Sequence, residues 1–164
     1  MSEAPALEPS ETELATARAT LEELLAKMKI TAIVTAGWSE PDEDGARAVL
    51  LDVRGDDLSV LIGRRGETLN ALQYLTRQLV SKKLNKGLNL VIDVENYRQR
   101  RREQLRRMAR RTAEQVVERR RPIALEPMPP DERRLIHLEL RDHPHVRTES
   151  IGEEPKRKVT IFPK

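Results

Sequence analysis

The segment Gly63-Arg64-Arg65-Gly66 constrains this chain most, because it places two glycines and two arginines directly before an amphipathic run. Glycine lets a backbone turn sharply and approach another molecule closely. The run from Glu67 to about Leu84 carries leucines at helical spacing, Leu69, Leu72, Leu75 and Leu79, which predicts a helix beginning at the loop. Helix N-termini attract anions, and arginine hydrogen-bonds phosphate. The segment is therefore either a polar turn or a clamp for a phosphate backbone.

The spacing of the glycines excludes two other phosphate-binding loops. A P-loop needs four residues between its glycines followed by Lys and Ser or Thr, and a dinucleotide-binding loop needs G-x-G-x-x-G. Neither pattern occurs around residues 63–66. A turn between a short helix and a longer one remains, with bare backbone exposed on both sides of the arginines.

Apolar periodicity around the loop predicts a complete mixed unit. Residues 10–13 have the pattern of a capping box, with Ser10 as the N-cap and Glu13 reaching back, and they open a helix to about residue 28. Alternating apolar residues predict strands at 30–38, 48–53 and 88–94, and a short helix at 56–62. The predicted order is helix, strand, strand, short helix, loop, helix, strand.

The second half of the chain predicts another mixed unit. A long helix extends from about Asn96 to Arg119, and an extended segment follows at 121–127. Pro129 and Pro130 set up a further helix to about Asp142, in which Leu135, Ile136, Leu138 and Leu140 are expected to face inward. Two alternating segments, 145–152 and 156–162, predict closing strands.

Positive charge is concentrated in one part of the chain. The whole sequence has a net charge of +3, yet residues 98–121 hold eleven arginines and three glutamates, a local net charge of +8. Such a cluster is typical of a surface that binds a polyanion, although a solvated Arg-rich helix has the same composition. We expect Arg101, Arg102, Arg106 and Arg110 to provide secondary electrostatic contacts.

Composition excludes several classes of protein. The chain has no cysteine, so disulfide scaffolds and Cys-ligated metal sites are ruled out. Its apolar runs are too short to span a bilayer, and its acidic N-terminus does not resemble a secretory signal. We expect a disordered leader at 1–9, a cytoplasmic protein and no insertion into membranes. The three histidines lack partners for a metal site, no catalytic triad or carboxylate pair is evident, and we expect neither cofactor nor enzymatic activity.

Aromatic residues are too scarce for recognition by stacking platforms. The chain has one Trp, two Tyr and one Phe, which disfavours RNA recognition of the RRM or OB type. A backbone clamp beside aliphatic side chains needs no such platform.

The stretches "LIGRRGETLNALQYL" and "LVIDVENYRQRR" resemble a type II KH domain across residues 10–96. KH domains clamp nucleotides with a G-x-x-G loop. Together with "PPDERRLIHLEL" and the ending "VRTESIGEEPKRKVTIFPK", they resemble the bacterial Jag (KhpB/EloR) family, which joins a KH domain to an R-x3-H domain. The resemblance implies an α+β protein: a type II KH domain (α-β-β-α-α-β), then a small α/β R-x3-H domain at 97–164, joined by the long Arg-rich helix.

Spacing supports the second motif independently. Arg133, His137 and Arg141 lie four residues apart, so they share one face of the predicted helix. Arginine can bind phosphate while histidine hydrogen-bonds or stacks on a base. The alternative is an ordinary solvated face.

The resemblance implies a non-enzymatic protein that binds single-stranded RNA, either mRNA or small RNA. Ile62, Gly63, Arg64, Arg65 and Gly66 would form the clamp, and the R-x3-H domain would assist. It also implies post-transcriptional regulation linked to cell elongation and division, and a small single-KH protein as partner. Compared with many family members, the chain is expected to lack the N-terminal Jag domain. Two alternatives remain open: a protein-interaction adaptor of the cell-envelope machinery, and a binder of single-stranded DNA.

Overall fold

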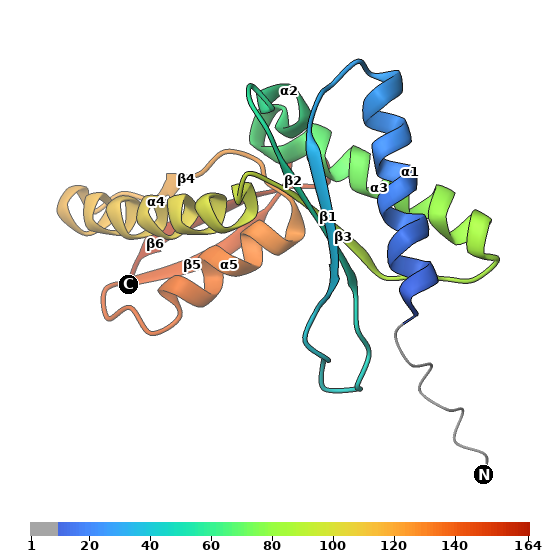
Figure 1. Ribbon diagram of the computed structural model, residues 1–164. Helices are drawn as coiled ribbons and strands as arrows, with labels where there is room; N and C mark the ends of the chain where they lie inside the picture. The colour runs from blue at the N-terminus through green and yellow to red at the C-terminus, as the bar shows by residue number, and fades with distance from the viewer. Residues whose placement is uncertain (1–9) are drawn as a thin grey trace, which may run out of the picture. The chain divides into compact units, whose positions relative to one another are not determined.

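Figure 1 shows the computed structural model of the chain, which describes residues 10–164. The predicted disordered leader, residues 1–9, lies outside the described residues. The chain divides into two compact units between Arg98 and Gln99. Each unit has its own hydrophobic core. Across residues 10–164, no helix combines the length and the apolar character needed to cross a bilayer.

The first unit contains the helix and strand order that the apolar periodicity predicts. Its elements are α1 (Glu11–Lys27), β1 (Ile33–Trp38), β2 (Val49–Arg54), α2 (Ser59–Ile62), the 3-10 turn η1 (Arg64–Gly66), α3 (Glu67–Leu84) and β3 (Leu90–Val94). The helix expected from Glu67 to about Leu84 is confirmed at both ends.

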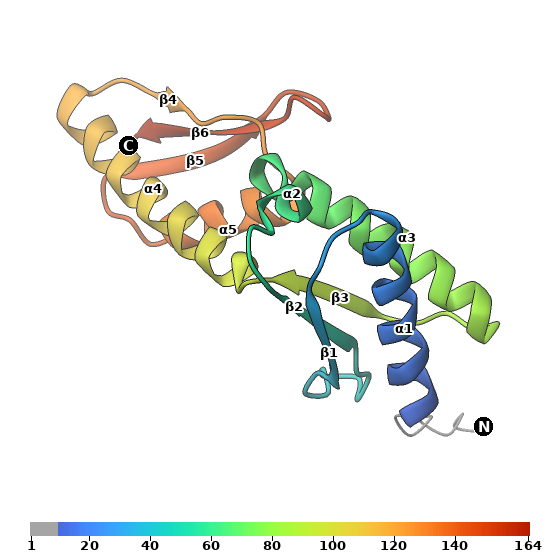
Figure 2. The same cartoon turned by 45° about the horizontal axis from the view of Figure 1, so that its top comes forward.

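The sheet of the first unit places the glycine loop in a crossover between two parallel strands. Its order is β1-β2-β3, with β1 antiparallel to β2 and β2 parallel to β3. A parallel pair needs a crossover connection, and here α2, η1 and α3 supply it. Leu51 and Ile92 pair in register, are almost fully buried, and belong to the same core as apolar residues of α1 and α3. The N-terminus of α3 is thereby held at a defined place beside the sheet (Figures 1 and 2).

The buried face of α3 differs from the predicted leucine stripe. Leu69 and Leu72 are buried as expected, but Leu75 and Leu79 are 53% and 39% exposed. Thr76 and Val80 are buried instead. The hydroxyl of Thr76 donates to the Leu72 carbonyl at 2.8 Å, so a threonine can face the core with its polar group satisfied. The expectation for Leu75 and Leu79 was therefore wrong.

The start of α1 also differs in part from the capping-box prediction. Ser10 caps the helix as expected, since its hydroxyl accepts from the Thr12 amide at 3.2 Å. The Glu13 side chain does not reach back to Ser10. It is buried and forms an ion pair with Lys86, which ties α1 to the segment that follows α3.

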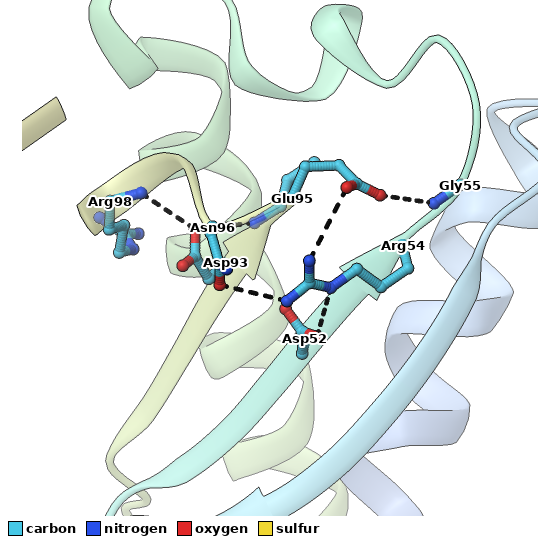
Figure 3. Close-up of polar contacts among 8 residues, drawn as sticks. Asp52, Arg54, Gly55, Asp93, Glu95, Asn96 and Arg98 are labelled. Atoms are coloured by element: carbon cyan, nitrogen blue, oxygen red, sulfur yellow. Dashed lines mark hydrogen bonds and ion pairs between the residues drawn. The ribbon is translucent and has the colours of Figure 1, made fainter. Parts of the chain in front are cut away.

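A polar network holds together the C-terminal ends of β2 and β3 (Figure 3). The Arg54 guanidinium contacts Asp52 at 2.7 Å, Glu95 at 3.8 Å and the Asn96 side chain at 3.1 Å. The Asp52 carboxylate raises the pKa of Arg54 above its ordinary value through this hydrogen bond and its charge. Glu95 and Asn96 both adopt left-handed backbone angles, which turn the chain from β3 into the next helix.

The second unit is a small sheet with helices that share its core. Its elements are most of α4 (Tyr97–Arg119), β4 (Ile123–Ala124), α5 (Pro130–Leu140), β5 (Val146–Ile151) and β6 (Lys158–Pro163). The strands are antiparallel in the order β4-β6-β5. Its core includes Leu105 and Ala109 of α4, Ile136 of α5 and Ile161 of β6. Leu138, expected to face inward, is 45% exposed because it lies on a different side of α5 from Ile136 and Leu140.

Candidate nucleic-acid interface

The glycine loop adopts a conformation that only glycine tolerates easily. Gly63 has φ 69° and ψ −170°, a region populated almost exclusively by glycine. Arg65 and Gly66 then have left-handed angles, with φ of 55° and 81°. The resulting turn bends the backbone tightly and leads directly into α3.

Close packing adds a second requirement for glycine at both ends of the loop. A Cβ on Gly63 would overlap Oγ1 of Thr68 and lie 2.8 Å from the Thr68 Cβ. A Cβ on Gly66 would lie 2.7 Å from Cε1 of Tyr97. Both contacts are too short for real atoms, so the loop is shaped by its neighbours as well as by its own dihedral angles.

The loop ends at an uncapped helix N-terminus. Gly66 is the N-cap of α3 and has no side chain to accept hydrogen bonds from the first-turn amides. Those amides and the helix dipole favour an anion at this position. Arg64 is exposed and Arg65 is half-buried, while Ile62 packs against the core of the unit. The five predicted clamp residues are therefore contiguous at one positively charged turn.

A second candidate site is a cavity of about 490 Å³ in the second unit, between α5 and β5. It contains all three residues of the predicted Arg-His-Arg face. Its charged and polar lining consists of Arg133, Arg134, His137, Arg141, Arg147, Thr148, Ser150 and Lys164. Among the described residues that line the cavity none is acidic, so it has the electrostatic character of an anion site.

His137 joins α5 to β5 within this cavity. Its Nδ1 lies 2.6 Å from Oγ1 of Thr148, and its Nε2 lies 2.8 Å from Oγ of Ser150. Burial lowers the pKa of His137 below its ordinary value of 6.5, and the positive charge of Arg133 lowers it further. The neutral ring is thus favoured near neutral pH, with one nitrogen donating and the other accepting.

The two arginines of the same face differ in exposure. Arg133 is only 7% exposed, and its Nε donates to the Met128 carbonyl at 3.1 Å. It also forms an ion pair with Glu154, in the turn between β5 and β6. Arg141, directly after α5, is exposed. Arg133 is therefore held by contacts within the unit, whereas Arg141 faces solvent.

The sequence analysis missed five polar residues that line the cavity: Arg134, Arg147, Thr148, Ser150 and Lys164. The alternation of β5 places Thr148 and Ser150 on one face of the strand, which could have been read from the sequence. That this face meets His137 depends on how α5 packs against the sheet. Arg147 precedes Thr148 on the strand, and its guanidinium stacks over the Phe162 ring at 4.5 Å.

Three of the arginines predicted as secondary contacts on α4 are paired with carboxylates of α5. Arg101 forms two hydrogen bonds with Glu132, at 2.8 and 2.9 Å, and both side chains are largely buried. Arg106 and Arg110 both approach Glu139, at 3.6 and 2.5 Å. Arg102 instead donates to Gln99 at 2.9 Å. These contacts offset part of the local positive charge that the sequence shows.

Within residues 10–164, no group of three or more His, Cys, Asp or Glu side chains is arranged to hold a metal ion. Anion binding at both sites would thus rely on backbone amides, arginine, lysine and hydroxyl groups.

Comparison with known families agrees with the order of the two units. The model described as "KhpA/KhpB, KH domain" matches residues 18–92, which include the glycine loop. The model of the R-x3-H domain matches residues 103–163, which include Arg133 and His137. The α+β organisation expected from the sequence, a KH domain followed by an R-x3-H domain, is confirmed.

Several bacterial proteins are similar to most of this chain. The chain is 38% identical to RNA-binding protein KhpB of Clostridium symbiosum over 86% of the chain and 62% of that protein. It is 35% identical to RNA-binding protein KhpB of Bacillus subtilis over 83% of the chain and 68% of that protein. The Lactiplantibacillus plantarum KhpB is 39% identical over 71% of the chain and 36% of its own length. The chain thus spans only part of the length of each of these relatives, and it belongs to the KhpB family.

Proposed function

We propose that this chain binds single-stranded RNA through the glycine loop and catalyses no reaction. The observation that carries the proposal is the left-handed turn at Gly63–Gly66, which presents two arginines beside the uncapped N-terminus of α3. Backbone amides, helix dipole and guanidinium groups all favour a phosphate at one place. The relatives' name, RNA-binding protein KhpB, supports RNA as the ligand.

The cavity of the second unit would extend the contact to the RNA. Its cationic lining and the hydroxyls of Thr148 and Ser150 suit phosphate oxygens, and His137 can hydrogen-bond a base edge. Single-stranded DNA is the competing ligand, because neither site has a feature dedicated to a 2′-hydroxyl. We place the protein in the cytoplasm, where mRNA and small RNA are found, and in post-transcriptional regulation linked to cell elongation and division.

The clamp is tested by replacing both loop arginines with alanine. Each lost phosphate contact to a single strand lowers the slope of log affinity against log salt by about 0.7. We therefore expect Arg64→Ala/Arg65→Ala to reduce this slope by about 1.4 and to weaken binding of short single-stranded RNA at low salt. The measurement is fluorescence anisotropy across a salt series, with RNA and DNA of the same sequence. An unchanged slope would exclude the loop as the binding site, and equal affinity for both strands would favour DNA as an equal ligand.

We further infer that a small single-KH protein binds the exposed apolar ridge of α3, formed by Tyr74, Leu75 and Leu79. These side chains are 57%, 53% and 39% exposed, which is unusual for three large apolar residues on one helix. The matching KH model describes both KhpA and KhpB, so one domain type occurs in two proteins.

The ridge is tested by placing a charge at its centre. We expect Leu75→Glu to weaken binding of the purified single-KH protein of the same organism at least about tenfold, because a carboxylate would be buried without a partner. Isothermal titration calorimetry measures the loss, with Ile33→Glu, at another exposed apolar position on β1, as the control. Equal binding by both variants would rule out the ridge.

A further inference from the structure

The open edge of the first unit's sheet is closed by side chains. β3 is the last strand of the order β1-β2-β3. The backbone amide of Ile92 on β3 donates to Oε1 of Gln73 at 2.9 Å, and the Ile92 carbonyl accepts from Nε of Arg98 at 2.8 Å. Gln73 and Arg98 thus take the place that a neighbouring strand would occupy.

Arg98 also links two carboxamides of α3. Its Nη2 donates to Oε1 of Gln73 at 2.8 Å, and its Nη1 donates to Oδ1 of Asn70 at 3.3 Å. The backbone of Arg98 is itself anchored, because its amide donates to Asp93 at 3.2 Å (Figure 3). The guanidinium is therefore held in position from both ends.

This network determines the orientation of both amides. The guanidinium of Arg98 and the amide of Ile92 can only donate hydrogen bonds, so the atoms that face them must be the carbonyl oxygens of Asn70 and Gln73. The NH₂ groups then point away from Arg98. Asn70 is exposed and Gln73 is half-buried. The outer side of the network is consequently rich in hydrogen-bond donors.

The two amides lie directly beyond the glycine loop. Asn70 and Gln73 follow Gly66 by four and seven residues, which places them on the same face of α3. At 1.5 Å per residue, they are about 6 and 10 Å along the helix axis from the loop. A strand whose backbone is held at the loop would have its neighbouring bases within reach of this face.

We propose that Asn70 and Gln73, held by Arg98, form a base-reading pair that prefers keto bases to amino bases. Uracil and guanine present a carbonyl oxygen, O4 or O6, where cytosine and adenine present an NH₂ group. Carboxamide NH₂ donors pair with the carbonyl oxygen and are repelled by the amino group. This inference rests on the proposed function, because it requires RNA held at the glycine loop.

The experiment compares uracil and cytosine octanucleotides, which stack weakly and differ at the position in question. At neutral pH we expect the wild-type chain to bind U8 at least about fivefold more tightly than C8. Gln73→Glu keeps an oxygen for Arg98 and Ile92 but replaces the NH₂ donor with an acceptor. The preference for U8 should therefore disappear or reverse. Gln78→Glu adds the same charge at an exposed position of α3 and should leave the ratio unchanged.

Two further measurements separate this inference from the clamp itself. Arg64→Ala/Arg65→Ala should weaken both octanucleotides while the U8 to C8 ratio stays as in the wild type. Equal wild-type affinities that still depend on these arginines would overturn base reading and leave the clamp intact. Fluorescence of Trp38, which packs against the core of the first unit, reports whether Gln73→Glu is folded. If it is not, Asn70→Asp at an exposed position makes the same exchange, and an unchanged ratio there would also overturn the proposal.

Discussion

Replacing Gly63 with alanine is expected to remove most of the RNA affinity and to destabilise the first unit by about 1–3 kcal/mol. The φ of 69° with ψ of −170° is strained for any residue with a Cβ, and that Cβ would overlap Oγ1 of Thr68. The loop must either shift or open α3 at its first turn. Since the bound conformation would then be populated only in part, the apparent affinity falls by the same fraction, about tenfold for each 1.4 kcal/mol.

Gly37→Ala provides the matched control, because it adds the same methyl group in the same unit. A Cβ on Gly37 meets nothing within 4 Å. Its unfolding free energy should stay within about 0.5 kcal/mol of the wild type, with unchanged RNA binding. Urea unfolding followed by fluorescence of Trp38, the only tryptophan, measures the first unit directly. If both variants unfold and bind alike, the loop does not need glycine at position 63.

Arg133→Met is expected to act chiefly on the stability of the second unit. The substitution removes the hydrogen bond from Nε to the Met128 carbonyl at 3.1 Å, at a site where both residues are buried. An unsatisfied buried carbonyl costs about 1–3 kcal/mol. The ion pair with Glu154 adds little, because the Glu154 side chain is 55% exposed and regains water when the arginine is removed.

The contrasting variant is Arg141→Ala, on the same cavity. Arg141 is exposed, so its loss should leave stability unchanged and lower the salt slope of RNA binding by about 0.7, the value for one phosphate contact. Unfolding of the second unit is followed by far-ultraviolet circular dichroism, while Trp38 fluorescence monitors the first. A drop in the salt slope for Arg133→Met with no change in its unfolding midpoint would contradict the structural role and assign Arg133 to the ligand.

Some features of this protein depend only on local sequence. The glycine loop, the helix from Glu67 to Leu84 and the order of strands were all predictable, because turns and amphipathic periods are set by neighbouring residues. The spacing of Arg133, His137 and Arg141 placed them on one face of a helix, and all three line one cavity. Combined motifs were also enough to identify the family.

Tertiary packing decided which side of each element matters. On α3, the choice between Leu75 and Thr76 as the buried residue depends on the rotation of the helix against the sheet, and a hydroxyl satisfied within the helix made Thr76 acceptable. The contact of His137 with Thr148 and Ser150 joins a helix to a strand, and that of Gln73 with Ile92 spans nineteen residues. Sequence periodicity gives the faces of an element, but the partner of each face is set by packing between segments distant in the chain, which one-dimensional patterns do not contain.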